Sequence, residues 1–279
     1  MKGWTLRPRS LVIDLFANYV RYHGGATSAQ ALLQLMEPFD VTAQVARVTL
    51  SRMKQQGWLS TTRHGRASWY ELTDMALREL DDGRERIFTR HSTDPWDGAW
   101  TMAIYHVPEE DRQIRQWLRT RLAWLGFGPL APSTWLSPRN RRADVLAAMG
   151  DHDVDAQVDL LEVRTGDLAK DRDLARRCWD LGHLNDGYSQ FIDHYTARFP
   201  AYEARELRGA DALVEHIELV HAYRKFPFED PDLPIELLPP DWNGLRAHEL
   251  FLQVYQLLLT PATEYFRAVH EPHPSPIAT

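Results

Sequence analysis

The sequence has few features of an exported protein and few of a membrane protein. Its single cysteine, Cys178, cannot form an intrachain disulfide. No apolar run approaches the roughly 18 residues that a membrane span requires. The N-terminus lacks the basic start and apolar core of a secretion signal. We therefore expect a cytoplasmic protein that does not enter a membrane.

Common catalytic and metal-binding motifs are also missing. The chain has 12 histidines, but it has no Gly-x-Ser-x-Gly, phosphate-binding glycine loop or dinucleotide fingerprint. His216 and His221 flank Glu218, yet a spacing of five places them about 140° apart on a helix, whereas zinc helices use a spacing of four. We therefore predict no catalytic residues, no metal site and no cofactor, and we interpret Cys178 as a small core residue.

Charge is distributed unevenly along the chain. The whole sequence is acidic, with 32 Lys and Arg against 39 Asp and Glu and a net charge of −7. Residues 1–72 reverse this balance, because nine basic and four acidic side chains give them a net charge of +5. The rest of the chain therefore carries −12, which is −7 minus +5. Only the N-terminal region is suited to approach a phosphate backbone.

The most informative segment is residues 41–70, which reads as a helix followed by a basic hairpin. Ala46, Leu50 and Met53 fall at i, i+4 and i+7, so they form one apolar stripe on the helix. Polar and basic residues project from its other sides. The side chains that we expect to contact DNA are Gln44, Arg47, Ser51, Arg52 and Gln55 on the helix and Arg63, His64 and Arg66 on the hairpin.

Two predicted helices precede this segment. The first covers residues 10–21 and follows Pro8. Thr27-x-x-Gln30 is a capping-box pattern that opens the second, over residues 29–36. Three helices followed by a hairpin indicate a winged helix-turn-helix, whose third helix enters the major groove. Taken alone, the third helix also fits an ordinary amphipathic surface helix with solvated arginines.

The remaining sequence predicts two further regions. A charged connecting helix over residues 74–90 leads to strands and helices in the order βαββαβ, which predicts a ferredoxin-like sandwich. Helices over residues 168–198, 211–224 and 245–269 follow, with a proline-rich extended segment at 226–242 that cannot be a regular helix. The fold class is therefore α+β. The predicted domains are the winged helix-turn-helix with its connecting helix (1–90), the ferredoxin-like domain (91–166), a mainly helical domain (167–270) and a disordered tail (271–279).

An aromatic and glycine-containing segment of the central region is a candidate ligand site. A helix end at Gly126 with aromatic packing around it explains most of its residue types. Alternatively, these residues line a pocket in which nearby arginines clamp a phosphate. The candidate effector-binding residues are Trp124, Gly126, Phe127, Trp135, Arg139, Arg141, Arg142, Arg224 and Lys225.

Five separated motifs carry a family resemblance. They are Pro8-Arg9-Ser10-Leu11, the run 47–59 ending in Gly57-Trp58-Leu59, Gly65-Arg66 before Trp69-Tyr70, the segment 124–128, and Phe226-Pro227-Phe228 continuing to Leu237-Leu238-Pro239. In this order, over about residues 7–266, they resemble the PaaX family of repressors of phenylacetic acid degradation operons. The resemblance implies a homodimeric repressor that binds a palindromic operator in double-stranded DNA. It also implies release by phenylacetyl-CoA or a related acyl-CoA.

Two other classes of function stay open at this point. Asp97 and neighbouring carboxylates on a ferredoxin-like domain could support a metal-dependent nuclease, which would cleave DNA rather than only bind it. Alternatively, the winged unit could serve only as a contact between chains in an assembly protein. The arginines on the predicted groove face argue against this second class.

Overall fold

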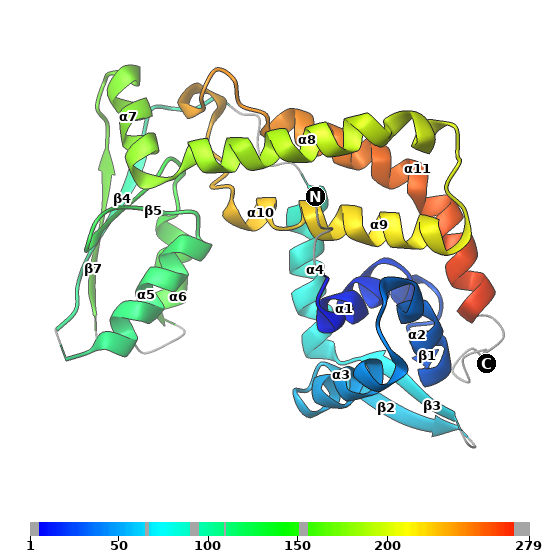
Figure 1. The fold of residues 1–279 in the computed structure, drawn as a ribbon. Helices are drawn as coiled ribbons and strands as arrows, with labels where there is room; N and C mark the ends of the chain where they lie inside the picture. The colour runs from blue at the N-terminus through cyan, green and yellow to red at the C-terminus, as the bar shows by residue number, and fades with distance from the viewer. Residues whose placement is uncertain (1–5, 65–66, 90–94, 109, 151–155, 271–279) are drawn as a thin grey trace. The chain divides into compact units, whose positions relative to one another are not determined.

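Two antiparallel sheets organise the fold (Figure 1). The computed structural model describes residues 6–64, 67–89, 95–108, 110–150 and 156–270. These residues form two units, each assembled from segments distant in sequence. Unit 1 lies within residues 1–90, 189–225 and 245–279, and unit 2 within residues 91–188 and 226–244. The domains predicted from the sequence are consecutive segments, whereas each of these units combines segments that are distant in sequence. The predicted domain boundaries stay a prediction.

The N-terminal part of unit 1, called the winged part below, contains three helices followed by a β-hairpin, which is the element order that the sequence predicted. Its elements are α1 (Pro8–Asn18), β1 (Ala26–Ser28), α2 (Ala29–Met36), α3 (Ala43–Gln55), β2 (Leu59–His64), β3 (Ala67–Leu72) and α4 (Asp74–Phe88), with 3-10 turns at Val20–Tyr22 and Glu37–Phe39. The strand order is β1-β3-β2. Strands β2 and β3 form a hairpin in which Leu59 pairs with Leu72.

The helix starts in this part are set by local side-chain caps. Ser28 Oγ accepts a hydrogen bond from the Ala31 backbone N–H at 3.0 Å, so Ser28 is the N-cap of α2. The predicted capping role of Thr27 is wrong, because Thr27 belongs to β1 and its buried hydroxyl lies 3.1 Å from His270 Nδ1. The chain then turns through Asp40 in the left-handed region, with φ of 58°, before α3 begins.

C-terminal helices complete the core of unit 1. The helices concerned are α9 (Gly209–Tyr223) and α11 (Gly244–His270). Ile217 from α9 and Phe266 from α11 are fully buried in one cluster with apolar residues of α1, α2 and α3. The ring of Tyr19 stacks on Phe266, and its hydroxyl lies 2.6 Å from His216 Nδ1. The winged part therefore does not close its core by itself.

Unit 2 contains a four-stranded sheet with the order β5-β6-β4-β7. Its first elements are β4 (Trp100–His106), α5 (Arg112–Trp124), β5 (Gly128–Ala131), β6 (Thr134–Ser137), α6 (Arg142–Gly150) and β7 (Gln157–Val163). This is the strand order of the predicted ferredoxin-like βαββαβ unit. Alternation along β6 places Trp135 in one core with α5 and α6, and Leu136 in another with Trp100 and Cys178.

The prediction of one helix over residues 168–198 is wrong, because two helices occupy this region. They are α7 (Leu168–Cys178) and α8 (Leu181–Glu203). Trp179 between them is extended, with φ of −138° and ψ of 142°, and its indole stacks near Trp100. Asp180 Oδ1 then accepts from the His183 backbone N–H at 3.0 Å, which starts the new helix. Apolar residues continue at helical spacing across this break, so the sequence pattern does not show where the first helix ends.

The proline-rich segment of unit 2 is mainly non-helical. It contains one four-residue helix that the sequence did not predict, α10 (Phe226–Glu229), and a 3-10 turn at Ile235–Leu237. The predicted disordered tail, 271–279, lies outside the described residues. Cys178 is buried as predicted, and burial raises the pKa of its thiol to about 11. Among the described helices, none is long and apolar enough to cross a membrane.

Candidate nucleic-acid interface

Helix α3 presents a polar and basic surface away from the core of unit 1. Ala46, Leu50 and Met53 are at most 1% exposed, which confirms the predicted apolar stripe. The predicted contact residues of this helix are all exposed: Gln44, Arg47, Ser51, Arg52 and Gln55. Within the described part of the chain, the guanidinium groups of Arg47 and Arg52 make no hydrogen bond or ion pair. Both remain able to contact an external acceptor.

The centre of the exposed face of α3 is Val48. Successive helical residues are rotated by about 100°, so Val48 lies about 200° from both Ala46 and Leu50. It is 46% exposed, and Val45 one turn earlier is 44% exposed. Neither valine was predicted as a DNA contact, because the pattern of polar and basic side chains on α3 does not include them.

An open groove of about 620 Å³ runs between α3 and the start of α1. On the α3 side it is lined by Val45, Val48 and Arg52, and on the α1 side by Arg7 and Arg9. Arg9 also places its guanidinium 4.9 Å from the centre of the Trp58 ring. No acidic side chain lines this groove. Arg7, at the N-cap of α1, and Arg9, within α1, are therefore further candidates for phosphate contacts that the sequence pattern did not predict.

The hairpin contributes one basic residue that the structure describes. Arg63 on β2 is exposed and pairs across the hairpin with Ser68. Trp69, on the neighbouring strand β3, is buried. The side chain of His64 and the whole of Arg66 lie outside the described residues. Their predicted wing contacts therefore stay predictions.

Two of the acidic residues of this region are held by partners. Asp14 is buried, and its Oδ1 lies 2.8 Å from Arg224 Nη1. Glu71 accepts a hydrogen bond from Ser60 Oγ at 2.9 Å. The sequence of α3 and β2 contains no acidic residue. The exposed side chains of these two elements therefore carry only positive charge, which favours a polyanionic partner.

Three domain families match successive parts of the chain. They are described as PaaX-like protein over residues 7–76, PaaX protein central Cas2-like domain over 93–175, and PaaX-like protein C-terminal domain over 179–268. The protein named Transcriptional repressor PaaX from Escherichia coli (strain K12) is 31% identical over 262 residues, which span 92% of this chain and 82% of that protein. The chain belongs to the PaaX family.

A solved structure of similar fold supports the mixed helix and sheet architecture of this PaaX-family chain. The uncharacterized protein Rv0674 from Mycobacterium tuberculosis superimposes with a TM-score of 0.64 at 26% sequence identity. The match covers 95% of this chain and 99% of that one. The family models and the Escherichia coli relative confirm the resemblance to the PaaX family that the sequence motifs indicated.

The nine predicted effector residues of this PaaX-family chain are divided between the two units and lie in different environments. Phe127 and Trp135 belong to the core of unit 2, and Gly126, with φ of 82°, ends α5. Trp124 is 47% exposed. Arg224 and Lys225 belong to the other unit.

The three central arginines already have partners within unit 2. Arg139 Nη2 lies 2.7 Å from Asp232 Oδ2, and Arg141 pairs with Asp144 at 3.3 Å. Arg142 donates to the Leu160 carbonyl at 2.9 Å. These contacts hold β6, α6 and the proline-rich segment in place, so a phosphate would have to compete for the same guanidinium groups.

A groove elsewhere in unit 2 brings cationic and apolar groups together. It has a volume of about 720 Å³ and is formed by the end of β4, by α5 and by the β5–β6 hairpin. Arg115, Arg119 and His106 supply the polar lining, and Leu130 and Trp135 supply apolar surface. Trp135 Nε1 is buried and has no hydrogen-bond acceptor among the described residues. Of the nine predicted residues, only Trp135 lines this groove.

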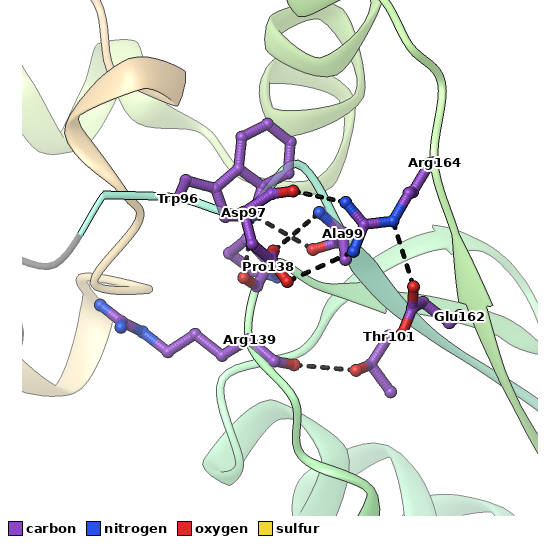
Figure 2. A network of polar contacts seen from close by, with 8 residues as sticks. All are labelled: Trp96, Asp97, Ala99, Thr101, Pro138, Arg139, Glu162 and Arg164. Atoms are coloured by element: carbon purple, nitrogen blue, oxygen red, sulfur yellow. Dashed lines mark hydrogen bonds and ion pairs between the residues drawn. The ribbon is translucent and has the colours of Figure 1, made fainter.

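The carboxylate proposed for a nuclease site is part of a structural network. Arg164 donates to both the carbonyl and the carboxylate of Asp97, and also to Glu162 (Figure 2). Trp96 Nε1 donates to the carbonyls of Ala99 and Pro138, each at 3.1 Å. The network fixes the chain as it enters β4. Among the described residues, no group of three or more His, Cys, Asp or Glu side chains is arranged to hold a metal ion.

Proposed function

We propose that this protein is a transcriptional repressor of phenylacetic acid catabolism that reads operator DNA with α3 and the β2–β3 hairpin. Arg47 and Arg52 carry this proposal, because both are exposed, have no partner among the described residues and lie on a helix whose opposite face is buried. Arginine can pair with guanine O6 and N7, and glutamine with adenine N6 and N7. Membership of a family that includes a named transcriptional repressor supports the same function.

We further propose that the repressor acts as a homodimer on a palindromic operator. Helix α3 has 13 residues, so it is roughly 20 Å long and reaches only a few base pairs. Two copies related by a two-fold axis place two such helices in half-sites about one helical turn apart. The dimer thereby multiplies both affinity and sequence discrimination.

The proposed effector is an aryl-acyl-CoA such as phenylacetyl-CoA, bound in the groove of unit 2 lined by Arg115, Arg119 and Trp135. An aryl group suits the apolar lining supplied by Leu130 and Trp135. Coenzyme A phosphates suit Arg119, whereas at Arg115 they would compete with the carbonyl of Pro108, which lies 3.0 Å from Arg115 Nη2. The effector releases DNA if it binds better to a dimer geometry in which the two α3 helices no longer match the half-sites.

The decisive experiment is a gel shift on the duplex that the full-length protein selects from random DNA. Arg47→Ala and Arg52→Ala should each weaken binding by about 1–3 kcal/mol where the arginine reads a guanine. If the arginine contacts a phosphate instead, its removal should reduce the magnitude of the slope of log K against log salt concentration by about one. Arg112→Ala, an exposed arginine of α5, is the matched control and should bind normally.

Two results would replace this proposal by another. Unchanged affinity and salt slope in both α3 variants would show that α3 is not the reading helix and would favour a role in chain assembly. Magnesium-dependent cleavage of the duplex would favour the nuclease alternative.

A further inference from the structure

Val48 and Val45 lie where helix formation alone does not favour valine. They are 46% and 44% exposed on the outer side of α3, so their burial contributes little to the free protein. β-Branched side chains also lose rotamer freedom in helices and stabilise them less than alanine, glutamine or arginine. Two exposed valines on one helix face therefore fit a surface that a partner covers.

The charges around these valines indicate the kind of partner. Arg7, Arg9 and Arg52 line the same groove as Val45 and Val48, and no acidic side chain joins them. The partner must therefore carry negative charge on its flanks and an apolar group at its centre. The major groove of DNA has this arrangement. Its edges are the two negatively charged phosphate backbones, and its only apolar group is the C5-methyl of thymine.

We propose that Val48 contacts a thymine C5-methyl group in each half-site and so selects thymine at that position. This inference rests on the proposed function, since it requires α3 to enter the major groove. Val48 occupies the middle of the exposed face, with Gln44 one turn before it and Arg52 one turn after it. The two polar side chains pair with base edges above and below, and Val48 fills the step between them. Val45 lines the same groove as Val48.

The test removes the methyl group from the DNA without changing its base pairing. Each thymine of the selected operator is replaced in turn by deoxyuridine, and binding to the full-length protein is measured. At the position that Val48 contacts, affinity should fall about fourfold, which corresponds to the ~0.8 kcal/mol of one buried methylene-sized group. In Val48→Ala, deoxyuridine at this position should no longer lower the affinity. The losses of affinity at other positions should stay as in the wild type.

Two controls separate this contact from changes in the protein. Val48→Ala should melt at or above the wild-type temperature, because alanine is the better helix former at an exposed site. Leu146→Ala removes an exposed apolar side chain of α6, 55% exposed, and should leave the deoxyuridine profile unchanged.

The outcomes distinguish this inference from the function on which it rests. Operator binding with no deoxyuridine penalty, or with the same penalties in Val48→Ala, overturns the methyl contact but leaves the repressor proposal intact. Absence of sequence-selective binding to any duplex overturns both. A penalty that disappears only in Val48→Ala supports both.

Discussion

Arg224 Nη1 lies 2.8 Å from Asp14 Oδ1, and this ion pair joins α9 to the first helix of the winged part across 210 residues of sequence. The carboxylate is 3% exposed, so it depends on the arginine for compensation. His221 Nδ1 lies 3.7 Å from the other carboxylate oxygen. Helix α9 therefore holds α1 by charge as well as by apolar packing, and Arg224 has a structural partner that the sequence did not reveal.

Removal of the arginine should destabilise unit 1. Arg224→Met leaves Asp14 buried without a counter-charge, and we expect the free energy of unfolding to fall by about 3–5 kcal/mol. Urea denaturation followed by circular dichroism measures this change. The control is Arg141→Ala, which breaks the exposed pair with Asp144 and should cost at most about 1 kcal/mol. Equal effects of the two variants would contradict the structural role of Arg224.

Acid should destabilise the protein in part through His216. Burial lowers the pKa of His216 from 6.5 to about 3. Above pH ~6.5 the side chain is neutral in both states. Below pH ~6.5 the imidazole is protonated in the unfolded chain but stays neutral in the folded chain. The free energy of unfolding therefore falls by up to ~1.4 kcal/mol per pH unit until about pH 3.

A double variant isolates this contribution. Tyr19→Phe/His216→Phe removes both polar partners together, so no buried donor or acceptor is left unpaired. Its stability should fall less steeply than that of the wild type between pH 7 and pH 5, in urea denaturation at each pH. His183→Gln, at an exposed histidine, should keep the wild-type slope. Parallel slopes for the double variant and the wild type would argue against a neutral His216.

Gly128 should tolerate no side chain. A Cβ atom at this position would lie 2.5 Å from Trp179 Cε2 and 2.7 Å from Cys178 Cβ, where α7 ends against β5. Gly128→Ala is therefore expected to cost about 1–3 kcal/mol by overpacking. Gly150→Ala, with no atom of the described residues within 4 Å of the added Cβ, is the control and should be nearly neutral or stabilising. A neutral Gly128→Ala would mean that this contact relaxes freely.

Phenylacetyl-CoA should raise the melting temperature of the protein. At 100 times its dissociation constant, a ligand specific for the folded state adds ~2.7 kcal/mol of stability. Arg119→Ala should reduce this shift and should also reduce release of operator DNA, whereas Arg112→Ala, earlier on the same helix, should not. A shift with free aromatic acids but not with the acyl-CoA would reject the proposed effector. An undiminished shift in Arg119→Ala would reject the proposed groove.

Local sequence patterns determined most of the elements of this protein and the buried side of α3. The spacing of Ala46, Leu50 and Met53 was sufficient for α3, because helical periodicity relates only residues within a few turns of each other. The order βαββαβ was readable for the same reason. The separate motifs also carried the family resemblance, since they follow one another in the right order along the chain.

Tertiary structure alone decided which elements meet and which side chains remain available. The pairing of Asp14 with Arg224 and the insertion of Phe266 into the winged core join residues more than 200 positions apart, and no local pattern records such contacts. The break at Trp179 follows from its packing near Trp100 in another element. Most of the predicted effector residues were already used in cores and ion pairs, while Val48 was left at the centre of the exposed face of α3. Residue type and spacing identify groups that can bind a ligand, but their packing determines which of them are free to do so.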